Sequence, residues 1–167
     1  MRVAVTGAGG RLGRALIAAL EEAPFTGPAG PIAWTRADFD LDAPAGITRV
    51  LERDRPEVVI NAAAWTDVDG CARDPELARA RNEDAVGVLA EACAGAGIDL
   101  VQVSTNEVFD GGRTDGLGYA PDDPPDPINA YGASKLRGEV AARAAFTGAR
   151  SQLAIVRTSW LLGPPGN

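Results

Sequence analysis

Short runs of apolar, β-branched residues alternate with longer alanine- and leucine-rich segments along this 167-residue chain. The short runs predict strands, and the longer segments have the residue spacing of helices that bury one face. Strands that are apolar along nearly their whole length and alternate with helices are typical of a parallel sheet with helices on both faces. With right-handed crossovers, the pattern predicts an α/β fold with a doubly wound parallel sheet of five strands in the order 3-2-1-4-5.

The predicted strands cover the ranges 3–6, 32–35, 57–61, 99–104 and 152–157. The predicted helices cover 12–22, 47–54, 75–94 and 128–145. Because 111–127 is rich in glycine, proline and aspartate, it predicts a long loop. The last residues, 163–167, also have the composition of a loop and follow the fifth strand without a closing helix. We therefore expect one domain, 1–167, that is the N-terminal part of a longer protein.

The composition argues against several kinds of chemistry and partner. The absence of histidine removes His-based acid/base catalysis and the commonest zinc ligand sets, and we expect no metal site. A net charge of −7 without a Lys/Arg cluster argues against nucleic acid or an anionic membrane as partner. No apolar run reaches membrane-spanning length. Cys71 and Cys93 lack Cys-x-x-Cys spacing and the N-terminus lacks a signal-peptide pattern, so we expect a cytoplasmic protein with reduced thiols.

A glycine-rich turn, Thr6–Gly13, joins the first strand to the first helix. Gly7 permits a tight turn, Gly10 lets the backbone approach a pyrophosphate, and Gly13 lets the helix pack closely on the strand. The free N–H groups at the start of the helix attract an anion. The turn therefore predicts a dinucleotide-binding domain, a Rossmann fold. The alternative is a tight structural turn that binds nothing.

Tyr131 and Lys135 lie four residues apart at the start of a predicted helix, so they share one face. A phenol with a pKa of about 10 exchanges protons at neutral pH only if its anion is stabilised, and the Lys135 ammonium supplies that positive charge. Without histidine, the pair is the best candidate for proton transfer. The alternative is an ordinary amphipathic helix.

Three further segments follow predicted strands, and ligands of open α/β sheets bind at the carboxyl ends of strands. Thr105 follows the fourth strand and can donate a hydrogen bond to a substrate carbonyl. Ala62–Ala64 follow the third strand and leave room for a flat ligand. Arg36 follows the second strand, where a guanidinium can pair with a 2′-phosphate. Arg36 therefore favours NADP(H) as cofactor and leaves NAD(H) possible. The alternatives are that Thr105 only caps the strand end, that Ala62–Ala64 only pack tightly, and that Arg36 is a solvated surface residue.

These motifs resemble those of the extended short-chain dehydrogenase/reductase superfamily, and within it the dTDP-4-dehydrorhamnose reductase family, the RmlD-like sugar-nucleotide reductases. The resemblance covers the whole chain. It is most specific in Asn61–Asp69 and in Arg157-Thr158-Ser159-Trp160, and it extends to Asp40-Leu41-Asp42, 104–111 and 129–139. It implies a reductase that delivers hydride to the 4-keto group of a dTDP sugar.

By this resemblance the catalytic residues are Thr105, Tyr131 and Lys135, and the last two also contact the cofactor. The other cofactor-binding positions lie in the glycine turn and after the second and third strands. They are Gly7, Gly10, Arg11, Leu12, Gly13, Arg36, Asp40, Leu41, Ala62, Ala63 and Ala64. The positions implied for the nucleotide-sugar substrate are Thr66, Val68, Thr105, Asn106 and Trp160. The family continues into a C-terminal region that grips the substrate, and this region is missing here. The sequence leaves open whether the protein forms a homodimer.

The chain departs from the family pattern after Thr105. The family usually has Asp where Asn106 stands, and often an aromatic residue where Glu107 stands. Ser-Thr-x-Glu-Val also resembles the sugar-nucleotide dehydratases, in which an acid in this segment is catalytic. A sugar-nucleotide epimerase or dehydratase, and a non-catalytic NAD(P)-binding subunit or sensor, therefore remain alternatives to the reductase.

Overall fold

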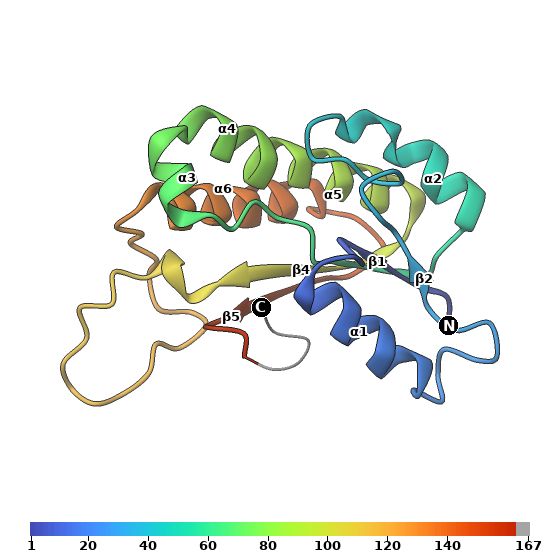
Figure 1. Ribbon diagram of the computed structural model, residues 1–167, viewed down its shortest axis with the longest axis horizontal. Helices are drawn as coiled ribbons and strands as arrows, with labels where there is room; N and C mark the ends of the chain where they lie inside the picture. Colours follow the sequence, from blue (N-terminus) through green and yellow to red (C-terminus); the bar gives the residue numbers. More distant parts are fainter. Residues whose placement is uncertain (163–167) are drawn as a thin grey trace.

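The computed structural model, which describes residues 1–162, contains a single sheet of five parallel strands (Figure 1). The strands are β1 (Val3–Thr6), β2 (Ile32–Ala33), β3 (Val58–Asn61), β4 (Asp99–Thr105) and β5 (Leu153–Thr158). The doubly wound α/β fold is confirmed, and every strand begins and ends within two residues of its predicted range. The loop predicted at 163–167 lies outside the described residues.

The strand order is 2-1-3-4-5, which corrects the predicted order 3-2-1-4-5. Strand β2 is only two residues long and forms one edge of the sheet. Strand β3 pairs with β1 on one side and β4 on the other, and its Val59 is fully buried. A buried strand needs hydrogen-bond partners along both edges, and a place outside the short β2 would leave one edge of β3 unpaired.

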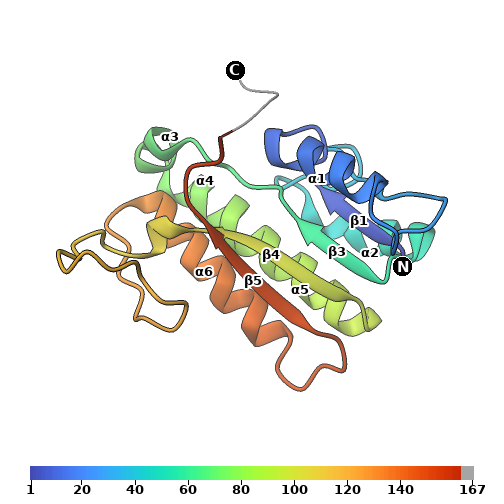
Figure 2. The same ribbon diagram turned by 90° about the horizontal axis from the view of Figure 1, so that it is seen from below.

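The helices cover the two faces of the sheet unequally (Figure 1). Helix α1 (Arg11–Glu21) lies alone on one face, and the other helices lie on the opposite face. Those helices are α2 (Ile47–Asp54), α3 (Val68–Arg73), α4 (Pro75–Arg79), α5 (Ala85–Ala96) and α6 (Ala130–Ala145). Figure 2 shows that α1 lies over the β1 side of the sheet, and that no helix of residues 1–162 covers β4 and β5 on this face. Val156 on β5 is accordingly 44% exposed.

The sequence predictions missed helix α3, which is short and begins at a capping residue. Asp67 accepts a hydrogen bond from the backbone N of Gly70 at 2.9 Å, which starts the helix directly after the alanine segment. The helix predicted at 75–94 is found, but a π-helical turn, Ala80–Asp84, separates α4 from α5. Such turns insert one extra residue into a helix and are frequent at functional sites.

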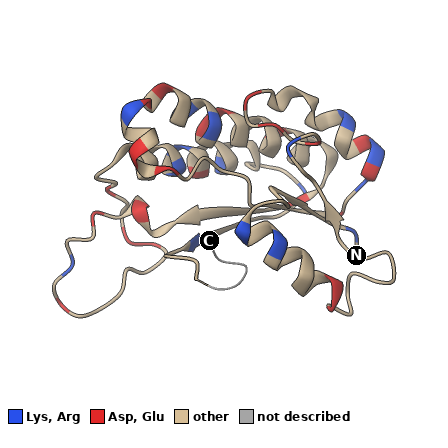
Figure 3. Ribbon diagram, in the orientation of Figure 1, with Lys and Arg blue, Asp and Glu red and all other residues tan. Residues whose placement is uncertain are grey.

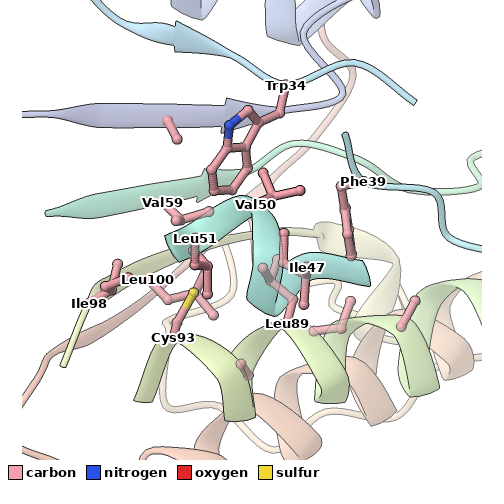
Figure 4. Close-up of a cluster of buried hydrophobic side chains, with 14 of the residues drawn as sticks. Trp34, Phe39, Ile47, Val50, Leu51, Val59, Leu89, Cys93, Ile98 and Leu100 are labelled. Atoms are coloured by element: carbon pink, nitrogen blue, oxygen red, sulfur yellow. The ribbon is translucent and has the colours of Figure 1, made fainter. Parts of the chain in front are cut away.

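The main core lies between the sheet and helices α2 and α5 (Figure 4). Trp34, which follows β2, is fully buried there, and its Nε1 donates to Asp54 Oδ2 at 2.8 Å. A smaller cluster under α1 joins Leu20 to Val3 and Val5. Charged side chains of both signs are interspersed over the helices and loops (Figure 3). No helix within residues 1–162 has both the length and the apolar character needed to cross a membrane.

Candidate cofactor and catalytic site

The glycine turn has the geometry that its sequence predicts. Gly7 adopts a left-handed φ of +61°, and a Cβ there would lie 3.0 Å from the backbone of Ala63. A Cβ on Gly13 would lie only 2.1 Å from Gly7 O, so only glycine lets α1 approach the turn this closely. The turn and the segment after β3 are thus packed backbone against backbone.

A pocket of about 310 Å³ opens beside this turn. It brings together eight of the predicted cofactor-binding residues: Gly7, Gly10, Arg36, Asp40, Leu41, Ala62, Ala63 and Ala64. Helix α1 begins at Gly10 without a side-chain cap, so the N–H groups of its first turn are left for an anion. The small side chains, the uncapped helix and the close-packed glycines fit the adenosine and pyrophosphate parts of a dinucleotide.

The three predicted catalytic residues meet where β4 ends and α6 begins. Thr105 is the last residue of β4, and its Oγ1 accepts from Glu107 N at 3.2 Å, which leaves its own O–H free to donate. Asn129 caps α6 by accepting from Gly132 N at 2.7 Å. A Cβ on Gly132 would lie 2.1 Å from Glu107 O, so this glycine allows the start of α6, with Tyr131, to approach the Thr105 segment.

The ionisation of Tyr131 differs from the sequence prediction. Burial raises the pKa of Tyr131, the neighbouring Thr105 side chain lowers it, and the Glu107 carboxylate raises it again. Lys135 is not among the groups that shift this pKa, so the predicted lowering is wrong for the cofactor-free protein. The physical reason is that the Lys135 ammonium points to the strand, where Nζ donates to Val103 O at 2.8 Å. The phenol is therefore held in its protonated form.

Lys135 belongs to a buried polar cluster that the sequence analysis missed. Glu139, one turn further along α6, is 1% exposed. Its Oε1 accepts from Ser104 Oγ at 2.6 Å, and its Oε2 accepts from Arg157 Nη2 at 2.7 Å. The cluster joins α6 to β4 and β5 directly beside Thr105. Lys135 and Glu139 lie four residues apart on α6, and this spacing was the signal in the sequence that could have revealed the cluster.

Burial lowers the pKa of Lys135 to about 8, and the Glu139 carboxylate acts in the opposite direction. The folded protein then releases the Lys135 proton at a lower pH than the unfolded chain, whose lysine pKa is about 10.5. Stability contributed by this residue is therefore lowest below pH 8 and rises as the pH increases above it. Lys135→Met is expected to abolish that rise.

Urea unfolding of wild type and Lys135→Met at pH 7 and pH 9 measures the effect. Because tyrosine and cysteine ionisation is common to both proteins, it cancels in the difference between them. An identical pH dependence of the unfolding free energy in the two proteins would contradict the lowered pKa of Lys135.

Six further predicted residues lie outside the pocket beside the glycine turn. Thr66, Val68 and Asn106 are exposed at the ends of β3 and β4, and Trp160, after β5, is 85% exposed. Arg11 is exposed at the start of α1, where its Nη1 donates to Leu161 O at 3.2 Å. Leu12 is half-buried on α1 and does not line this pocket either.

Two residues of the π-helical turn were also missed. Arg81 lines the pocket, with its guanidinium 5.2 Å from the centre of the Trp65 ring. Asn82 is buried and holds Trp65 by two hydrogen bonds of 2.9 Å, while its Nδ2 also donates to Ser134 Oγ at 3.0 Å. Asn82 thereby connects the cofactor pocket to α6. Within residues 1–162, no three His, Cys, Asp or Glu side chains gather as a metal ion would require.

A family model described as the RmlD substrate binding domain matches residues 1–167. The chain belongs to this family. A dTDP-4-dehydrorhamnose reductase from Burkholderia thailandensis is 42% identical over 166 residues, covering 99% of this chain and 52% of that protein. The chain thus spans about half the length of the curated relatives that it matches.

Solved structures of the RmlD type have the same fold. A Bacillus anthracis dTDP-4-dehydrorhamnose reductase in complex with NADP superposes with a TM-score of 0.86 at 35% identity, covering 99% of this chain and 56% of that one. A Clostridium acetobutylicum dTDP-4-dehydrorhamnose reductase has a TM-score of 0.87 at 34% identity, covering 100% and 56%. The family resemblance stated from the motifs is confirmed.

Proposed function

We propose that residues 1–167 are the NAD(P)-binding domain of a reductase that acts on the 4-keto group of a nucleotide sugar, of the dTDP-4-dehydrorhamnose reductase type. The observation that supports the proposal is that the Thr105 and Tyr131 side chains interact where β4 ends and α6 begins, in a chain that also has the glycine-turn pocket. A relative of 42% identity is named dTDP-4-dehydrorhamnose reductase, which supports the same substrate class here. A solved structure of a relative in complex with NADP supports NADP(H) as cofactor, with NAD(H) the second choice.

In this proposal the bound cofactor supplies hydride to the carbonyl carbon of the sugar. The carbonyl oxygen then gains negative charge and needs a proton as the charge forms. Thr105 donates a hydrogen bond to that oxygen, and Tyr131, whose raised pKa keeps it protonated, gives up its phenolic proton. Lys135 holds the start of α6 against β4 through its hydrogen bond to Val103 O, and so positions Tyr131 beside Thr105.

Glu107 favours a second candidate, an epimerase or dehydratase of the same superfamily. Its carboxylate lies close enough to raise the pKa of Tyr131, and its Oε2 accepts from Asn129 Nδ2 at 2.6 Å. An acid at this position can exchange a proton with a substrate. The hydrogen bond to Asn129 ties Glu107 to the cap of α6, which favours a positioning role in the reductase.

The cofactor half of the proposal is tested by Gly10→Val. A Cβ on Gly10 would enter the pocket wall and would also lie 3.2 Å from Gly7 O. We expect the affinity for NADPH, measured by calorimetry, to fall well over tenfold. Gly9→Val is the matched control, because a Cβ on Gly9 meets nothing within 4 Å and Gly9 does not line the pocket.

Circular dichroism and the thermal midpoint of both variants separate a lost site from a lost fold. Unchanged NADPH affinity in a folded Gly10→Val protein would remove the glycine turn from the cofactor site. Equal losses in both variants would mean that any added bulk in the turn disrupts it, and the assignment to Gly10 would fail.

A further inference from the structure

Two arginines from distant parts of the chain converge on one carboxylate at the rim of the cofactor pocket. Arg36, after β2, donates from Nη2 to Asp42 Oδ2 at 2.6 Å. Arg81, in the π-helical turn, donates from Nε to Asp42 Oδ1 at 2.6 Å and from Nη2 to Oδ2 at 2.8 Å. Both arginines and Asp42 line the pocket. The two guanidinium groups therefore lie side by side, with one shared acceptor between them.

Each guanidinium also has a second contact that does not depend on Asp42. Arg36 Nε lies 3.2 Å from both carboxylate oxygens of Asp40. The Arg81 guanidinium lies over the Trp65 ring, and only 24% of its side chain is exposed. Arg81 is thus held by the surrounding fold as well as by Asp42, whereas Arg36 is exposed and is held by the carboxylates of Asp40 and Asp42.

Two guanidinium groups that share one acceptor can hold a phosphate monoester, with the Asp40 carboxylate as a second partner of Arg36. A guanidinium binds phosphate through parallel N–H donors, and a monoester carries about −1.5 to −2 charges at pH 7. Asp42 offers one negative charge at the same place. The carboxylate is ionised at neutral pH, because hydrogen bonding from Arg81 holds the pKa of Asp42 below its usual range.

We propose that Arg36 and Arg81 form the subsite for the 2′-phosphate of NADPH, and that Asp42 occupies this subsite as an internal competitor. The inference rests on the proposed function and adds two residues to it, since neither Arg81 nor Asp42 was among the predicted cofactor positions. NADPH must displace the Asp42 carboxylate from between the arginines, or bind beside its charge. NADH, which lacks the 2′-phosphate, meets neither penalty. Asp42 therefore reduces the preference for NADPH that the two arginines create.

The decisive measurement is the dissociation constant of each dinucleotide for wild type and Asp42→Asn, by calorimetry at fixed ionic strength. Asparagine keeps the shape of the side chain and removes its charge. We expect NADPH to bind about tenfold more tightly to Asp42→Asn, while the NADH constant changes less than about threefold. The fragments 2′,5′-ADP and 5′-AMP, which differ only in the 2′-phosphate, are expected to follow NADPH and NADH respectively.

Arg81→Gln is the complementary variant, and the chain offers a matched control for each change. We expect Arg81→Gln to weaken NADPH and 2′,5′-ADP about tenfold and to leave NADH nearly unchanged. Arg79 pairs with Asp84 at 2.9 Å on the same helical segment, and neither lines the pocket. Arg79→Gln and Asp84→Asn therefore repeat the two charge changes outside the subsite and should leave both dinucleotides unaffected.

The outcomes separate this inference from the function on which it rests. If both dinucleotides bind but Asp42→Asn leaves their ratio unchanged or weakens NADPH, the competitor role of Asp42 is refuted. If Arg81→Gln weakens NADH as much as NADPH, Arg81 contacts the adenosine and not the 2′-phosphate, which also overturns the subsite. If the folded wild type binds neither dinucleotide, the proposed function fails, and the inference fails with it.

Discussion

Tyr131→Phe is expected to slow reduction of a dTDP-4-keto-6-deoxysugar by about a hundredfold or more, the usual contribution of a positioned acid. The substitution removes only the phenolic oxygen, so the packing at the start of α6 should survive. The chain has no histidine and Lys135 is directed at Val103 O, so Glu107 is the alternative proton donor that this experiment must exclude. Single-turnover kinetics with saturating NADPH isolates the chemical step, on the protein as its gene encodes it.

Glu107→Gln is the matched control for this experiment. Glutamine can still accept the hydrogen bond from Asn129 and cannot act as an acid, so a reductase should lose less than about tenfold in rate. A larger loss in Glu107→Gln than in Tyr131→Phe would refute the reductase mechanism and favour the dehydratase. A folded wild type that binds NADPH and reduces no keto sugar would instead favour the non-catalytic sensor.

Arg157→Met is expected to lower the free energy of unfolding by about 3–5 kcal/mol, because it leaves the buried Glu139 carboxylate without its hydrogen-bonded cation. Glu139 is 1% exposed, and Arg157 donates to both of its carboxylate oxygens, at 2.9 and 2.7 Å. The guanidinium also lies 5.0 Å from the centre of the Phe109 ring and donates to Pro121 O in the long loop. Urea unfolding followed by circular dichroism measures the loss.

A double variant distinguishes the unpaired charge from lost packing. Glu139→Gln combined with Arg157→Met removes both charges, and we expect it to recover a large part of the stability that Arg157→Met loses. Lost packing of the arginine stem would persist in the double variant. A loss below about 1 kcal/mol in Arg157→Met would mean that water reaches Glu139 once the arginine is gone.

The sequence predicted most of the strands and helices because each has a local signal. Apolar runs mark the strands, helical spacing marks the helices, and the glycine turn marks where α1 begins. The order of the strands depended on which edge of β1 the third strand joins, and no local pattern encodes that choice. It follows from the two-residue length of β2, which only the hydrogen bonding of the assembled sheet reveals.

The same limit applies to the site. Gly7, Tyr131 and Lys135 occur in motifs with fixed spacing, so sequence reasoning found them. The pair of Asp42 and Arg81 is separated by 39 residues, and Glu139 and Arg157 lie on different elements. Such partners are polar residues without a local pattern, and only the folded chain shows that they meet. For the same reason the direction of the Lys135 side chain, which donates to Val103 O, could not be predicted.

The π-helical turn at Ala80–Asp84 makes the length of this segment a constraint of its own. Deleting one residue between Arg79 and Ala85 would allow an uninterrupted α-helix and so improve the local hydrogen bonding. Because the wide turn absorbs its extra residue locally, α4 and α5 would keep their orientation, and the remaining residues of the turn would move round the helix to close it. Arg81 would leave the pocket rim, and Asn82 would leave Trp65. A substitution in this segment affects only the contacts of that one side chain. The deletion of a single codon removes the contacts of both Arg81 and Asn82 at once.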